Sequence, residues 1–117
     1  MVAPRRVPLF ASALLFLAAP DPSLEQAQTC RAHMELFIED VSRESEHIAG
    51  PTWFIRDWWT LKAIEAGSPE DDDAIIEGLK RDLTALRAEH SDQFDAGRQG
   101  CVDTAIEAGA VPGMGPE

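Results

Sequence analysis

The 117-residue chain has no tyrosine, only two cysteines, and ten basic residues against 21 acidic ones. It also lacks a nucleophile elbow, a phosphate-binding loop and the serine, histidine and aspartate order of a hydrolase. We therefore predict neither enzymatic activity nor a cofactor. The formal charge of −11 makes the surface repel nucleic acid and anionic lipid, so neither is an expected partner. A basic protein or peptide would instead be attracted to it.

The N-terminal region lacks an apolar run long enough to cross a membrane. Arg5 and Arg6 precede a mostly apolar stretch of about 13 residues, Val7 to Ala19, whereas a membrane helix needs about 20. A basic segment followed by a short apolar one is the layout of a secretory signal peptide. We expect 1–19 to be a signal peptide or, because its end fits a cleavage site poorly, an N-terminal anchor. The expected location is periplasmic or secreted.

A small acidic domain remains after this segment. We expect residues 20–109 to form one helical domain and 110–117, which is rich in proline and glycine, to form a disordered tail. Without residues 1–19, eight basic residues oppose 21 acidic ones and the formal charge becomes −13. A domain this small has a marginal core, so a disulfide or a second subunit would stabilise it. Cys30 and Cys101 have one intramolecular pairing in an oxidising compartment, and we predict that disulfide.

Apolar residues recur at steps of three and four along most of the chain, which predicts an all-α fold. Gly50-Pro51 is expected to bend the chain, Gly67 to end a helix, and Ser68 to cap the next one. The expected helices cover about 22–49, 52–66 and 69–108. The sequence Ala-Ile-Glu-Ala-Gly occurs at 63–67 and again at 105–109. We interpret it as the same helix ending used twice rather than as a duplication.

The predicted disulfide discriminates between two arrangements of these helices. In an up-down-up bundle of three helices, Cys30 and Cys101 lie near opposite ends, beyond the roughly 7 Å between Cα atoms that a disulfide allows. A long bent hairpin with its tip at Gly67 places them side by side. We expect this hairpin, with a compact three- or four-helix bundle as the alternative. The further residue pairs expected to face each other are Met34 and Gly97, Phe37 and Phe94, Val41 and His90, Ile48 and Leu83, and Ile55 and Ile76.

All three tryptophans lie within seven residues, next to a phenylalanine. These aromatic side chains cover more of a helix circumference than one neighbouring helix can bury. They either close a local core or form an interface, where tryptophan is enriched. The predicted interface residues are Trp53, Phe54, Trp58 and Trp59. The expected partner is a protein, basic by charge complementarity, or a second copy of the chain in a homodimer.

Two groups of side chains have part of the residue pattern of a metal site. Glu44 and His47 have the spacing found in di-iron helical bundles, which also require a second such pair and two more glutamates. The acidic run 70–73 lacks the spacing and the glycine of a calcium loop, and acids at a helix start already interact favourably with the helix dipole. We predict no metal at either group.

The two histidines other than His47 also lie in the predicted helices. Cys30, His33 and Cys101 would supply only three zinc ligands, and export favours the disulfide over this site. His90 lies in the apolar stripe of the third expected helix. Because imidazole titrates near neutral pH, His90 is the expected pH-sensitive position.

These features predict an exported, acidic, helical protein-interaction module. One alternative is an acid-responsive periplasmic chaperone, because a short exported helical chain with one disulfide resembles, in outline, the acid-stress chaperones of the bacterial periplasm. In that case, protonation of carboxylates would weaken the fold and expose the tryptophans. The other alternative is an inhibitor of a basic secreted enzyme such as a lysozyme or a nuclease, where negative charge would accelerate association.

Overall fold

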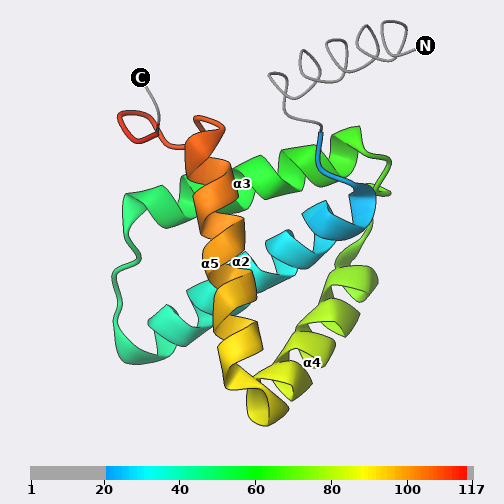
Figure 1. The fold of residues 1–117 in the computed structure, drawn as a ribbon, viewed down its shortest axis with the longest axis vertical. Helices are drawn as coiled ribbons and strands as arrows, with labels where there is room; N and C mark the ends of the chain where they lie inside the picture. The colour runs from blue at the N-terminus through cyan, green and yellow to red at the C-terminus, as the bar shows by residue number, and fades with distance from the viewer. Residues whose placement is uncertain (1–20, 116–117) are drawn as a thin grey trace, which may run out of the picture.

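The computed structural model describes residues 21–115, which form four α-helices in a compact bundle (Figure 1). The helices are α2 (Leu24–Glu44), α3 (Gly50–Glu65), α4 (Asp73–Glu89) and α5 (Ser91–Glu107). The predicted all-α class and the predicted disulfide are both confirmed. The predicted signal segment lies outside the described residues. Within the described part of the chain, no helix is both long and apolar enough to span a membrane.

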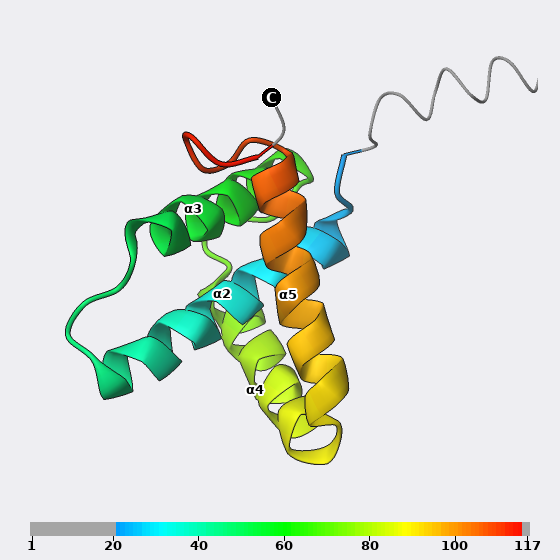
Figure 2. The ribbon, with the colours of Figure 1, turned by 60° about the vertical axis from the view of Figure 1, so that its left-hand side comes forward.

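Two helices form the centre of the bundle. Both α2 and α5 contact all three other helices, while α3 and α4 share no contact in the described residues. Figures 1 and 2 show α5 crossing α2 and meeting α4 at their short connection. The bundle therefore has two sides, one with α3 and one with α4.

Each side has its own apolar core. The first core joins α2, α3 and α5, and its buried residues are Ala27, Cys30, Met34, Ile55, Trp59, Ala63, Cys101, Ala105 and Val111. The second core joins α2, α4 and α5, and its buried residues are Ala32, Leu36, Ile76, Leu83 and Phe94. The first half of α5 thus packs with α4, and its second half packs with α3. Val111 belongs to the first core although it lies within the segment 110–117 that we expected to be a tail.

The long hairpin is not the observed arrangement, and the alternative four-helix bundle is. Instead of continuing α2, α3 runs back along it, since Glu35 pairs with Arg56 and Gln28 with Ser68. The chain reverses first in the connection 45–49, ahead of Gly50-Pro51, and again after Gly67, since α4 runs in the same direction as α2.

The single helix expected over 69–108 is divided at His90, which ends α4 and precedes α5. The chain turns back there, so Cys101 returns to the level of Cys30 and a compact bundle accommodates the disulfide. The disulfide therefore excludes only a bundle in which the segment 69–108 does not reverse. Among the expected facing pairs, Ile55 and Ile76 belong to different cores, and Gly97 faces His33 instead of Met34.

The two copies of Ala-Ile-Glu-Ala-Gly end α3 and α5 in the same way, as the sequence indicated. Gly67 and Gly109 have φ angles of 109° and 85°, in the left-handed region that glycine adopts without strain. The amide of Ser68 donates to the carbonyl of Ala63, and that of Ala110 donates to Ala105. Both endings are Schellman motifs, so capping chemistry explains the repeat.

Candidate functional site

The helix α3 leaves four large apolar side chains exposed in addition to the ones that it buries. Its buried residues are Thr52, Ile55, Trp59 and Ala63, which recur at steps of three and four. Trp53, Phe54, Leu61 and Ile64 occupy the opposite arc and are 39%, 50%, 50% and 53% exposed. We call these four residues the outer face of α3. Two other large apolar side chains are exposed among the described residues, Ile75 on α4 and Met114 near the C-terminus, so the apolar exposure is concentrated on α3.

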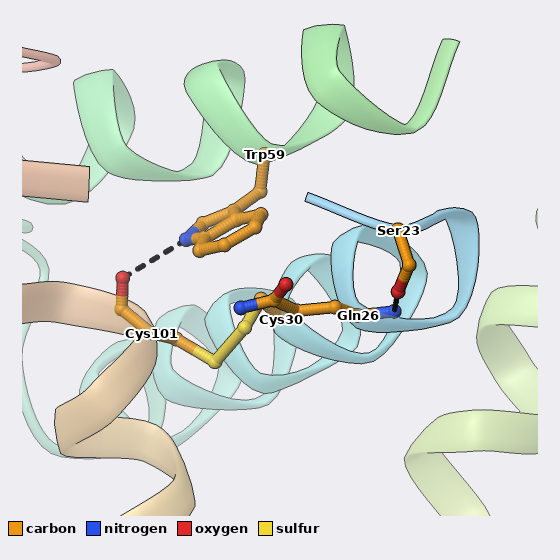
Figure 3. The surroundings of a disulfide bond; sticks show 5 residues. All are labelled: Ser23, Gln26, Cys30, Trp59 and Cys101. Carbon is orange, nitrogen blue, oxygen red and sulfur yellow. Dashed lines mark hydrogen bonds between the residues drawn. A yellow bond between two sulfur atoms is a disulfide. The ribbon is translucent and has the colours of Figure 1, made fainter. Parts of the chain in front are cut away.

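Trp59 anchors the inner arc. Its ring is completely buried, and its Nε1 donates a hydrogen bond of 3.0 Å to the carbonyl of Cys101 (Figure 3). The disulfide from Cys101 to Cys30, with 5.4 Å between the Cα atoms, lies beside it. We included Trp59 in the predicted interface, but this burial makes it a core residue instead. The indole N–H has a partner, as a buried tryptophan requires.

The other predicted interface residues lie at or near the surface. Trp53 and Phe54 belong to the outer face, and Trp58 is half-buried with its ring edge-on to Trp59. The guanidinium of Arg56 lies over Trp53, and the ammonium of Lys62 lies over Trp58. The sequence did not identify Leu61 and Ile64 as interface residues. Leu61 lies seven residues after Phe54, and Ile64 lies seven residues after Asp57. Residues at this spacing lie on the same side of a helix, and this is the signal that could have identified them.

Two carboxylates lie on the same arc as the apolar side chains. Asp57 and Glu65 are both exposed, and Leu61 lies midway between them in helical spacing. Arg56 contacts Asp57 and also Glu35 on α2, while Lys62 contacts Glu65. The outer face of α3 therefore combines apolar side chains with acidic ones that are only partly neutralised.

The acidic run 70–73 is largely part of a helix junction. Asp72 is buried, and it accepts hydrogen bonds from Arg31 Nη1 at 2.7 and 2.8 Å and from the Ser68 hydroxyl at 2.9 Å. Burial alone would raise the pKa of Asp72, but these hydrogen bonds outweigh it and hold the pKa below its usual value. Ser68 therefore ties Asp72 in place instead of capping the third helix as expected, and α4 begins at Asp73.

The other metal-site candidates are not assembled. Glu44 ends α2, and His47 lies in the exposed connection 45–49, so the two do not share a helical face. Both cysteines are oxidised to the disulfide, so neither offers a thiolate to a metal. In residues 21–115, no group of three or more histidine, cysteine, aspartate or glutamate side chains is placed to hold a metal ion.

The buried histidine is His33, and the expected one, His90, is exposed at the junction of α4 and α5. His33 is 3% exposed, its ring centroid lies 5.0 Å from that of Phe94, and its Nδ1 has no hydrogen-bond partner among the described residues. Burial, together with the positive charge of Arg98, lowers the pKa of His33 to about 4. The sequence placed His90 on an apolar stripe, but the helix that was expected to bury it ends there and leaves it exposed.

Comparison with protein-family models, curated proteins and solved structures found no match to this chain. The chemistry of the chain's own surface is therefore the basis for assigning a function.

Proposed function

We propose that the protein is an exported interaction module that binds a basic protein through the outer face of α3. The observation that carries this proposal is the group of four exposed apolar side chains on α3. Trp53, Phe54, Leu61 and Ile64 lie exposed on one arc, although Ile55 and Trp59 already fill the arc that faces the core. A helix selected only for folding gains nothing from apolar side chains on an exposed arc, since the stabilisation of about 25 cal/mol per Å² requires apolar area to leave water.

The composition of the outer face supports protein binding. Grouped apolar side chains on a surface are typical of interaction sites, whereas single ones are common everywhere. Aromatic side chains are enriched among the residues that dominate binding energy, and Trp53 and Phe54 are of this kind. We expect these two, with Leu61, to form the centre of the contact.

Charge selects the partner. Asp57 and Glu65 lie among the apolar side chains, and the whole chain carries a formal charge of −11. Two copies meeting through this face would bring like charges together, which costs free energy. A partner that presents apolar side chains flanked by lysine or arginine would instead be attracted by the carboxylates on this face and by the negative charge of the whole chain. A basic secreted enzyme is one protein that meets this description.

The disulfide supports the exported part of the proposal. Disulfides persist in oxidising compartments and are rare in reducing ones. The first residues, with two arginines ahead of a short apolar run, are those of a secretory signal peptide.

Site-specific photo-crosslinking in the cells that produce the protein tests the proposal. The photoreactive residue p-benzoylphenylalanine replaces Leu61 in one variant and Ile75 in the matched control. Ile75 is similarly exposed and lies on α4, which does not touch α3. We expect a covalent adduct with one basic protein at position 61 and no such adduct at position 75.

Three results would contradict the proposal. They are the absence of an adduct at position 61, the same adduct at both positions, and an adduct at position 61 formed with a second copy of the chain. Repeating the experiment at raised salt checks the electrostatic component. The yield at position 61 should fall as salt screens the attraction between the acidic module and its basic partner.

Buried ionisable groups favour a second candidate, the acid-responsive periplasmic chaperone. His33 is buried in its neutral form, and Asp40 and Asp72 are held as carboxylates by arginines. Acid would charge the first and neutralise the other two, and all three changes favour the unfolded state. Tryptophan fluorescence and ANS binding, followed from about pH 7 to about pH 3, test this candidate. Unchanged signals across that range would exclude it.

A further inference from the structure

Three arginines share one carboxylate where α2, α4 and α5 meet. Asp40 of α2 accepts contacts from Arg43 on the same helix, from Arg87 of α4 at 3.0 Å and from Arg98 of α5 at 3.1 Å. Burial alone would raise the pKa of Asp40, but the hydrogen bonds from Arg98 and Arg87 outweigh it and hold the pKa below its usual value. The carboxylate is therefore ionised at neutral pH and neutralises one of the three positive charges.

At the Asp40 junction three basic side chains share one carboxylate, whereas elsewhere in the described residues several basic side chains each contact two carboxylates. Arg31 and Arg56 each contact two carboxylates, and so does Lys80. Acidic residues outnumber basic ones twofold in the chain, so a local excess of arginine is unexpected. The Asp40 junction is thus a cationic site in an acidic protein.

The arginines retain unused hydrogen-bond donors. Each guanidinium carries five N–H donors, whereas a carboxylate has about four acceptor positions in total. The Nε of Arg98 is buried and has no acceptor among the described residues. A buried donor without an acceptor is unfavourable, so the hydrogen-bonding capacity of Arg98 is not exhausted by Asp40.

Aromatic rings fix the orientation of two of these guanidinium groups. The Arg98 Cζ lies 5.2 Å from the ring centroid of Phe37 and 4.8 Å from that of Phe94. The Arg87 Cζ lies 4.6 Å from the centroid of Phe94, whose ring is completely buried. Guanidinium groups held in this way present their donors in a fixed plane, which suits the two oxygens of a carboxylate or the oxygens of a phosphate.

An open cleft of about 490 Å³ lies over the junction. It is lined by the three arginines, by the carboxylates of Asp40 and Glu44, and by the apolar side chains of Phe37 and Val41. These lining residues have a formal charge of +1, and Asp95 of α5 also lies close enough to interact with Arg98. The cleft thus offers charged donors together with two apolar side chains.

We propose that this cleft binds a small organic anion. Its carboxylate or phosphate group accepts hydrogen bonds from Arg43, Arg87 and Arg98, and its apolar part lies against Phe37 and Val41. The site is formed by α2, α4 and α5, so it is separate from the outer face of α3 and does not depend on the function proposed for that face.

The test is an NMR titration of the ¹⁵N-labelled protein with benzoate, phenyl phosphate and inorganic phosphate at constant ionic strength. The Nε–Hε signals of Arg87 and Arg98 report contact with the anion directly. We expect saturable shifts with at least one aromatic anion, at a Kd below about 10 mM, and weaker binding of inorganic phosphate. The absence of saturation with both aromatic anions would overturn the proposal. Inorganic phosphate binding as tightly as phenyl phosphate would also overturn it, since the apolar wall would then contribute nothing.

Two variants and one control separate this site from general charge attraction. Arg43→Gln and Arg87→Gln each remove one donor group from an exposed position, so the fold should survive. Each should weaken binding about 10-fold, because a hydrogen bond to a charged group contributes about 1.5–3 kcal/mol. Arg81→Gln removes the same charge from an exposed position on α4 outside the cleft, and it should leave the affinity unchanged. Equal weakening by Arg81→Gln and Arg87→Gln would contradict a specific site.

Discussion

The two arcs of α3 carry similar residue types but have different environments. Trp59 on the inner arc is completely buried and hydrogen-bonded to Cys101, while Trp53 on the outer arc is more than a third exposed. The inner arc is completed by small residues that let α2 and α5 approach, and the outer arc by larger ones without a neighbouring helix. The comparison shows that α3 has one arc buried in the core and a second arc whose apolar surface is not covered by another helix of the described residues.

Removal of the disulfide is expected to have the largest effect, and it acts on the core against which the inner arc packs. The bond closes a loop of 71 residues, and loop-closure entropy gives it a contribution of about 4 kcal/mol to the free energy of unfolding. The double variant C30A/C101A should lose this amount in urea unfolding followed by circular dichroism. A loss below about 1 kcal/mol would show that the packing of α5 on α2 does not depend on the bond.

Replacement of the inner and outer tryptophans compares the two arcs directly. Trp59→Ala should cost about 4 kcal/mol of unfolding free energy, since it leaves a cavity and removes the partner of the Cys101 carbonyl. Trp53→Ala should cost less than about 1 kcal/mol, as is usual for an exposed position. Circular dichroism is the suitable probe, because both substitutions alter fluorescence. Similar losses from the two variants would remove the distinction between the arcs.

Acid is expected to weaken the interior of the protein through His33. The folded-state pKa of about 4 lies below the unfolded value of 6.5, so the unfolded chain binds the proton first as pH falls. The contribution of His33 to the unfolding free energy is therefore fully present above about pH 6.5. It is lost as pH falls towards 4, which lowers the unfolding free energy by up to roughly 3 kcal/mol. Asp40 and Asp72 have lowered pKa values, so their contribution is lost in a lower window, below their unfolded value of 3.8.

Two variants assign the upper pH window. His33→Phe removes the titrating group beside Phe94, and it should flatten the stability curve between about pH 6.5 and pH 4. His90→Gln changes an exposed histidine and should leave the slope as in the parent protein. If the slope persists in His33→Phe, another group carries it.

Polar substitution of the outer face is expected to have the smallest effect on stability. The triple variant F54S/L61S/I64S removes three exposed apolar side chains and should change the unfolding free energy by less than about 1 kcal/mol. Urea unfolding of the triple variant and the parent protein checks this. A loss comparable to that of Trp59→Ala would mean that the outer arc contributes to the core.

Much of the architecture follows from local sequence signals. Steps of three and four predict helices, glycine at 67 and 109 predicts their ends, and two cysteines in an exported chain predict one bond. The helix signals depend on residues close in sequence, and two cysteines allow one intramolecular disulfide. The same steps do not specify which helices are neighbours, and for that reason the hairpin expectation failed. The reversal at His90 contains neither glycine nor proline, the residues that most strongly mark a turn.

The candidate site was predictable only in part. The tryptophan-rich segment indicated an interface, and Trp53 and Phe54 do lie at the surface. Hydrophobicity alone, however, does not choose between the arc of Phe54, Leu61 and Ile64 and the arc of Ile55, Trp59 and Ala63, since both are apolar. The orientation of α3 depends on the close approach of α2 and α5, which only the tertiary structure reveals. The arginine junction at Asp40 also joins residues 58 positions apart and leaves no local signal.

The affinity of the partner cross-linked at position 61 for three forms of the protein tests the central claim most directly. The forms are the parent protein, the triple variant F54S/L61S/I64S and the matched control Ile75→Ser on α4. We predict that the triple variant binds at least about 30-fold more weakly, since loss of one central contact residue costs about 2 kcal/mol or more. The control should bind like the parent. Equal affinities of the parent and the triple variant would contradict the assignment of the outer face of α3 as the binding surface.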